Sequence, residues 1–275
     1  MKGTLDSNVE FDLKWNLCGF KGSVLDLTTF EFRENAKDDY IEMSTGYEWR
    51  EPTQEESKFF TNLYGEILPD NEERKCHQTV LSTALMGKTL ERFTIFQGKG
   101  RNGKGLLDEV LMTALGERED GYAYKGPVEV LTGGKKLGAC PEIANMNKKR
   151  LVCFTEPQDK KERLNNSICK ELTGGRTTGA RRCYSNDRMV HLLCTIILEC
   201  NDPPEFQESI TDAERERLIS VLFPCKYTSN EKILDERKKI YKANPTYKTI
   251  EFQEQYKFAM MRILIDTYKE DKGEV

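Results

Sequence analysis

Apolar residues recur along the chain in two patterns, short continuous runs and repeats at three- to four-residue spacing. The continuous runs have the length of buried strands and lie at 93–96, 151–154, 191–198 and 218–223. The spaced repeats predict helices at 53–67, 71–86, 106–115, 164–172 and 250–268. This mixture favours an α/β fold in which helices flank a central parallel sheet.

The remaining elements are shorter. We expect a small amino-terminal α+β segment in which strands near 11–13, 23–27 and 30–33 form a hairpin around Gly19–Gly22. Thr53 and Glu56 have capping-box spacing at the start of a helix, and Asn71 is placed to cap the next one. Residues 122–124 and 128–131 look extended, and 141–146 is a candidate short helix.

The run at 93–96 leads into a glycine-rich stretch that a helix follows at once. The stretch has the form G-x-x-x-x-G-K and consists of Gly98, Lys99, Gly100, Arg101, Asn102, Gly103, Lys104 and then Gly105. Strand, glycine loop, lysine and helix form the context of a phosphate-binding loop. Its backbone N–H groups and the helix amino terminus face the phosphates, and Lys104 is predicted to reach the β- and γ-phosphates of ATP. A plain glycine turn is the alternative.

Two further strands deliver polar residues at their carboxyl ends. Residues 151–154 end in Thr155 and Glu156, and the run at 191–198 is followed by Asn201 before two prolines. In a parallel sheet both ends lie beside the phosphate-binding loop. Glu156 is therefore a candidate Walker B carboxylate, and Asn201 is a candidate for orienting the attacking water. The alternative for Glu156 is a solvated strand end.

Basic residues outnumber acidic ones between positions 170 and 188. They include Lys170, Arg176, Arg181 and Arg182, against only two acids. A glycine-rich loop with arginines is suited to following a phosphate backbone, which makes these four residues candidate DNA contacts. A solvated turn is the alternative.

Composition limits the remaining choices. The 275 residues carry a net charge of −4, so a nucleic-acid contact requires a local basic surface. No apolar stretch approaches the roughly 20 residues of a membrane span, and no membrane role is expected. Nine cysteines without a C-x-x-C pair, and only two histidines, argue against a zinc site and for reduced thiols in an intracellular, reducing compartment.

The ordered set of motifs resembles the superfamily 3 helicases, most of all the primase–helicases of nucleocytoplasmic large DNA viruses and related phages and plasmids. The set runs from Gly98–Lys104 through Leu151–Glu156, Lys170–Gly175 with 180–181 and Asn201–Pro204 to Arg217–Phe223. The segment 16–27 resembles the region that precedes the helicase domain in those proteins. The resemblance covers almost the whole chain.

The resemblance implies an AAA+-like P-loop ATPase that forms a hexameric ring around single-stranded or forked DNA. It implies three parts: residues 1–88 before the helicase domain, an ATPase core at 89–228, and a helical segment at 229–275. Glu156 would hold Mg²⁺ through water, and Asn201 would be the sensor. The 170–182 segment would supply the DNA-contacting loop. Arg217 would be the arginine finger that reaches a neighbouring subunit's ATP, with Arg215 as the substitute.

Three residues depart from the family pattern. Gly105 stands where Ser or Thr usually ligates Mg²⁺, Glu156 is a single acid where many relatives have two, and Arg176 replaces an acid. The primase domain that the resemblance leads us to expect upstream is not among these 275 residues, so a stand-alone helicase, a split gene product and a fragment are all open alternatives. A primase or polymerase on another chain is then an expected partner.

These expectations lead to one main hypothesis and two rivals. The main one is an ATP-dependent DNA helicase in viral or mobile-element genome replication, acting in the host cytoplasm or at a viral replication site. Gly105 motivates the second, a nucleotide-binding assembly or regulatory subunit with weak hydrolysis. A small-molecule P-loop kinase is the third, but it leaves the arginines at 170–182 and 215–217 unexplained.

Overall fold

The computed structural model describes residues 9–133, 141–156, 162–174, 178–180 and 188–275. Its centre is a five-stranded, wholly parallel sheet with the strand order β10-β4-β9-β6-β5. The strands are β4 (Phe93–Gln97), β5 (Ala123–Gly126), β6 (Leu151–Thr155), β9 (Thr195–Cys200) and β10 (Leu218–Leu222). The predicted α/β fold with a central parallel sheet is therefore confirmed.

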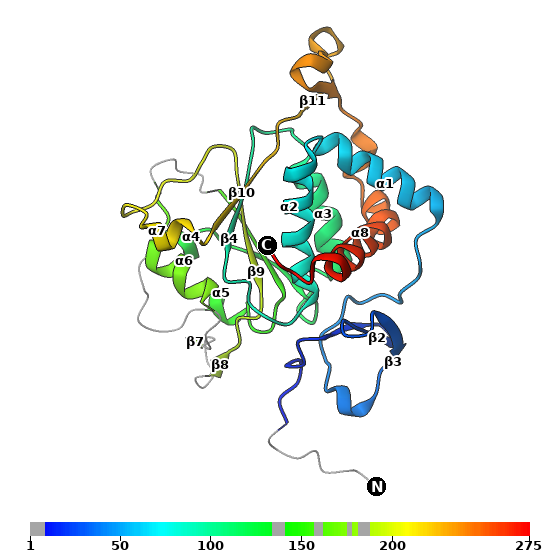
Figure 1. The fold of residues 1–275 in the computed structure, drawn as a ribbon, viewed down its shortest axis with the longest axis vertical. Coiled ribbons are helices and arrows are strands. Elements are labelled where there is room, and N and C mark those ends of the chain that lie inside the picture. The colour runs from blue at the N-terminus through cyan, green and yellow to red at the C-terminus, as the bar shows by residue number, and fades with distance from the viewer. Residues whose placement is uncertain (1–8, 134–140, 157–161, 175–177, 181–187) are drawn as a thin grey trace.

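Helices cover both faces of this sheet (Figure 1). On one face lie α1 (Gln54–Ile67), α2 (Asn71–Ser82), α3 (Lys104–Leu115) and α8 (Ile250–Asp271). On the other lie α4 (Glu129–Thr132), α5 (Pro141–Ala144), α6 (Asn166–Thr173) and α7 (Asp212–Arg215). Strand residues alternate between two buried apolar clusters, as the side-chain period of two requires: Phe96 and Ile197 face the first group of helices, Ile95 and Leu198 the second.

Helix α8 joins the carboxyl-terminal part of the chain to the core. It packs on α3, α2 and α1, and its Met260 and Leu264 are fully buried. None of the helices in the described part of the chain combines the length and apolar character that a membrane crossing needs. The predicted division at 88/89 and 228/229 stays a prediction.

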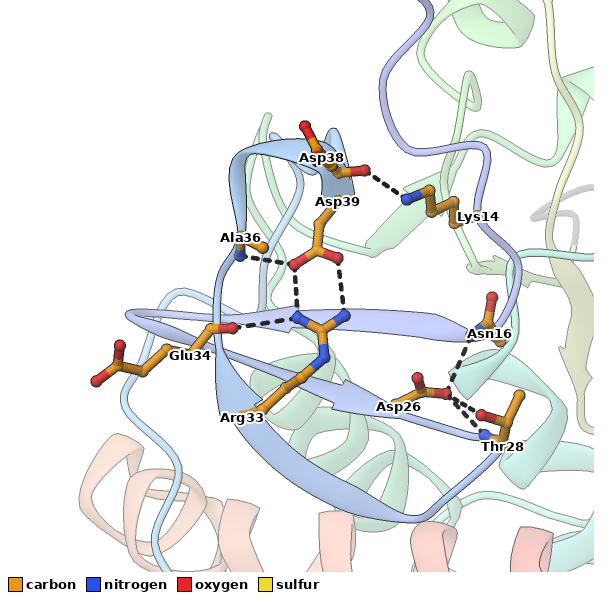
Figure 2. Close-up of polar contacts among 9 residues, drawn as sticks. All are labelled: Lys14, Asn16, Asp26, Thr28, Arg33, Glu34, Ala36, Asp38 and Asp39. Atoms are coloured by element: carbon orange, nitrogen blue, oxygen red, sulfur yellow. Dashed lines mark hydrogen bonds and ion pairs between the residues drawn. The ribbon is translucent and has the colours of Figure 1, made fainter.

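The amino-terminal part forms a separate three-stranded antiparallel sheet from β1 (Leu17–Phe20), β2 (Ser23–Asp26) and β3 (Glu31–Glu34). Gly22, at φ +78°, makes the turn between β1 and β2. Figure 2 shows Arg33 of β3 facing Asp39 of the 3₁₀ turn η1 (Lys37–Asp39). Two hydrogen bonds of 2.8 Å join them, and this pairing lowers the pKa of Asp39 to about 2.

Several local predictions are corrected. Residues 11–13 form no strand, and the first strand, β1, starts only at Leu17. The cap of α2 is Asp70, whose carboxylate accepts from the N–H groups of Glu72 and Glu73, rather than Asn71. The capping box of α1 at Thr53 and Glu56 is confirmed.

Further corrections concern the sheet and its second face. Val128–Leu131 is not extended: the turn of α4 buries Leu131 completely against the sheet. Strand β9 begins at Thr195 instead of His191. Strand β10 is an edge strand and only partly buried, with Leu222 47% exposed.

Beyond β10 the chain leaves the sheet and forms a small projection before α8 (Figure 1). It contains β11 (Lys226–Thr228) and β12 (Ile240–Lys242), which pair in parallel. Three 3₁₀ turns accompany them, η3 (Glu231–Ile233), η4 (Glu236–Lys238) and η5 (Pro245–Lys248). Elsewhere in the described chain, the 3₁₀ turn η2 (Thr83–Leu85) extends α2. The short strands β7 (Thr178–Ala180) and β8 (Arg188–Val190) pair antiparallel.

Candidate nucleotide-binding site

The glycine-rich loop spans residues 98–103 and joins β4 to α3. Gly98 has φ +152° and Gly103 φ +90°, and a Cβ atom at either position would meet other atoms at 2.4 Å (the Phe223 carbonyl oxygen) or 2.8 Å (Ile67 Cγ1). Both positions therefore require glycine. Arg101 also has positive φ, +67°, so the loop is tightly wound.

The backbone of this loop presents unused hydrogen-bond donors. Within the described chain, the N–H groups of residues 99–103 donate to no backbone or side-chain acceptor. The Asn102 side chain is 3% exposed, and its Nδ2 is buried without a partner in the described residues, while its Oδ1 accepts the Lys104 N–H at 3.1 Å. Buried donors are normally paired, so the Asn102 Nδ2 indicates a ligand. Lys99, Gly100 and Arg101 are exposed, so their N–H groups are open to solvent and to a ligand rich in acceptor oxygens, such as a phosphate chain.

Lys104 is the first residue of α3 and is 8% exposed. Its Nζ donates to the carbonyl oxygens of Cys200 (2.6 Å) and Gly98 (3.2 Å), and it makes no ion pair with any residue that the structure describes. The ammonium is thus held at the carboxyl end of β9 by neutral groups alone. A cation held in this way can still bind an anion directly.

Glu156 and Asn201 meet at the same edge of the sheet. Glu156 follows β6, Asn201 follows β9, and these strands are neighbours. The Asn201 backbone N–H and its Nδ2 both donate to the Glu156 carboxylate, the latter at 3.0 Å. A Cβ at Gly100 would lie 3.8 Å from Asn201 Oδ1, so the pair faces the glycine loop. The predicted convergence of these side chains is what the structure shows.

Besides Glu156, a second acidic residue lies near this end of the sheet: Glu199, near the end of β9, which was not among the predicted site residues. Burial, and then the charge of Asp108, raise the pKa of Glu199 to about 8, and Lys104 opposes the rise. Burial also raises the pKa of Asp108, on α3, although Lys125 lies 3.6 Å from it. A glutamate inside an otherwise apolar run was the available signal. Glu199 lies on β9, the strand between β4 and β6.

Gly105 lies one residue into α3 and is exposed. A Cβ at this position would meet nothing within 4 Å. The absence of a hydroxyl therefore does not reflect a lack of space. That Glu156 holds Mg²⁺ through water stays a prediction.

The structure does not bring Arg217 to this site. The N–H of Phe93 donates to the Arg217 carbonyl at 2.8 Å, so Arg217 lies at the amino end of β10 and β4. Five strand residues at about 3.3 Å each separate that end from the loop. Arg217 and Lys170 instead line one small pocket beside α6, with Glu214. Arg215 is exposed on α7.

The predicted DNA-contacting residues are described only in part. Lys170 is exposed on α6, and Arg176, Arg181 and Arg182 lie outside the described residues. The backbone on either side forms the antiparallel pair β7–β8.

Comparison with known proteins supports the resemblance. The chain is 32% identical over 230 residues to a candidate helicase of Acanthamoeba polyphaga mimivirus, an alignment that covers 81% of this chain and 23% of the relative. It is 26% identical to a primase of fowlpox virus (strain NVSL), over 96% of this chain and 34% of the relative. The chain is homologous to viral helicases and primases. No protein-family model matches it.

This homology extends to a candidate helicase of Invertebrate iridescent virus 6, 28% identical over 64% of the chain. The chain spans only 18–34% of the length of these relatives. Among solved structures, the carboxy-terminal region of NrS-1 has the same fold. It gives a TM-score of 0.55 at 17% identity, and the alignment covers 82% of this chain and 49% of that one.

Proposed function

We propose that this chain binds ATP with Mg²⁺ in the loop 98–105 and is the motor part of an ATP-dependent DNA helicase of the superfamily 3 type in viral genome replication. The observation that carries the proposal is the loop itself: five unused backbone donors, the buried Asn102 Nδ2 and the Lys104 ammonium at one point. The homology to viral helicases and primases supports the DNA-related part.

In this proposal each side chain has one task. The loop N–H groups bind the phosphate oxygens, and Lys104 binds the β- and γ-phosphates. The Asn102 Oδ1 accepts a hydrogen bond from the Lys104 backbone N–H, and this bond orients the first turn of α3. Mg²⁺, when bound, neutralises charge on the phosphates.

The Glu156–Asn201 pair handles the attacking water. Glu156 accepts two hydrogen bonds from Asn201, so its carboxylate is fixed in direction. Glu156 then polarises the water, and the Asn201 amide positions it. Fixed groups of this kind lower the cost of reaching the transition state because they need no rearrangement.

Arg217 completes the site only from another copy of the chain. Its place at the amino end of β10 keeps it away from Lys104 of its own chain. A homo-oligomeric ring, hexameric in this proposal, brings it to the neighbour's ATP. Single-stranded or forked DNA passes through the ring, where Lys170 and the arginines at 176, 181 and 182 contact its backbone, and a primase is the expected associate.

An ATPase assay with and without single-stranded DNA tests the proposal. We expect hydrolysis that single-stranded DNA stimulates. Gly105 supports a second candidate, a nucleotide-binding assembly or regulatory subunit with weak hydrolysis. ATP binding without turnover, in the presence or absence of DNA, favours this second candidate over the helicase.

A further inference from the structure

A basic projection stands at the edge of the sheet that carries the phosphate-binding loop. It comprises residues 226–248, between β10 and α8, and extends away from the core (Figure 1). This basic projection contains seven Lys or Arg and three Asp or Glu, a formal net charge of +4 in a chain whose total is −4. A polyanion that approaches the molecule is therefore attracted to this segment, whereas the remainder of the chain carries a formal net charge of −8.

Much of this positive charge is available to a partner. Lys242 pairs with Glu231 at 2.5 Å and Lys238 with Asp235 at 3.6 Å, which occupies two of the acids. Lys226, Lys232 and Arg237 are exposed and make no ion pair with any residue in the described part of the chain. Exposed lysine and arginine side chains of this kind break no ion pair when they meet phosphates, and each phosphate that they neutralise releases condensed counterions.

The basic projection is also attached to the phosphate-binding loop. The N–H of Tyr227, in β11, donates to the carbonyl of Arg101 at 2.7 Å. Arg101 is the loop residue with φ +67°, so this hydrogen bond supports an unfavourable backbone conformation. Inside the basic projection, the N–H of Lys226 donates to the Lys239 carbonyl at 2.9 Å and ties β11 to the segment before β12.

We propose that the basic projection is a second nucleic-acid contact, which binds the phosphate backbone through Lys226, Lys232 and Arg237 and is coupled to the nucleotide site through the Tyr227–Arg101 hydrogen bond. The inference rests on the proposed helicase function. It adds a contact separate from Lys170, which lies beside the amino end of β10, whereas the basic projection follows the carboxyl end of that strand. Because the contact is with phosphates, it is independent of base sequence.

The test compares two double variants of the full chain with matched charge changes. Lys232→Ala with Arg237→Ala removes two charges of the basic projection. Lys37→Ala with Lys58→Ala, two exposed lysines on η1 and α1 without an ion pair to described residues, is the control. Affinity for a fluorescent oligothymidylate is measured by anisotropy over a series of salt concentrations, and ATPase activity with and without it.

We expect the projection variant to bind the oligothymidylate more weakly. The slope of its log binding constant against log salt concentration should be shallower by about 1.4, since each phosphate of single-stranded DNA that the protein neutralises adds about 0.7 to the slope. DNA stimulation of hydrolysis falls while basal hydrolysis and the melting temperature stay at wild-type values. The control keeps the wild-type slope.

Other outcomes overturn the inference in distinguishable ways. If the wild type binds DNA and the projection variant matches the control, the inference fails and the proposed function stands. If the wild type hydrolyses ATP but binds no DNA, the helicase proposal fails with it. If poly-glutamate displaces the strand as effectively as unlabelled DNA at equal charge, and only from protein with an intact projection, the surface is for an acidic polypeptide.

Discussion

Replacing Gly105 with serine is expected to strengthen Mg²⁺ binding in the presence of ATP. A Cβ at Gly105 meets nothing within 4 Å, and this position in the first turn of α3 is exposed, so the side chain is accommodated without rearrangement. Serine is also the better helix former, by roughly 0.5 kcal/mol. The protein should therefore not lose stability.

The gain comes from the new hydroxyl group, which is the usual metal ligand at this position. A polar contact to a charged group contributes about 1.5 kcal/mol, which corresponds to roughly tenfold in the Mg²⁺ concentration that half-saturates hydrolysis. The assay is steady-state ATP hydrolysis over a Mg²⁺ titration. Gly105→Ala is the matched control, because it adds the same Cβ without the oxygen.

The reasoning is refuted if the serine and alanine variants have the same Mg²⁺ dependence. In that case the missing hydroxyl does not limit metal binding in this chain. A lower melting temperature for both variants would show in addition that the space at position 105 is not open.

Variants of Gly103, Glu199 and Arg217 test separate parts of the account. Gly103→Ala should lose about 1–3 kcal/mol of stability, because it places a side chain at φ +90° against Ile67. Gly100→Ala is the control: its Cβ would have its nearest neighbour at 3.8 Å, so this variant should have the melting temperature of the wild type. Equal melting temperatures for the two variants would contradict the loop geometry. Because the folded-state pKa of Glu199 is about 8 against an ordinary 4.5, folding favours its protonated form, so the contribution of this group to stability is fully present below pH 4.5 and is lost, by up to about 1.4 kcal/mol per pH unit, as pH rises to 8. Glu199→Gln should remove that slope in denaturant titrations across this range, and an unchanged slope would exclude Glu199 as its source. Arg217→Ala should lower ATP turnover by roughly 10³-fold and leave nucleotide binding intact, whereas Arg215→Ala should have little effect on turnover. The reverse result would identify Arg215 as the arginine finger.

Features set by neighbouring residues were predictable from the sequence. The strand, glycine loop and helix at 93–115 are encoded locally, since Gly98 and Gly103 supply the positive φ angles that the turn requires. The meeting of Glu156 with Asn201 followed from one further rule, that carboxyl ends of parallel strands share an edge.

Features that depend on distant segments were not predictable in this way. The pKa of Glu199 depends first on burial in the folded chain and then on the charges of Asp108, Lys104 and Lys125, which come from other elements of the fold. The hydrogen bond between Tyr227 and Arg101 joins residues more than 120 positions apart. Val128–Leu131 has an apolar pattern too short to separate a strand from a helix turn, and packing of Leu131 on the sheet decides it.

Equilibrium binding of ATP to Lys104→Ala tests the central claim most directly. Lys104 is the buried cation of the loop, and its Nζ contacts only the carbonyl oxygens of Gly98 and Cys200 in the described structure. The account predicts that the folded variant, checked by its melting temperature without nucleotide, binds ATP at least about tenfold more weakly and no longer hydrolyses it. A folded Lys104→Ala protein that binds and hydrolyses ATP as the wild type does would contradict the assignment of this loop as the nucleotide site.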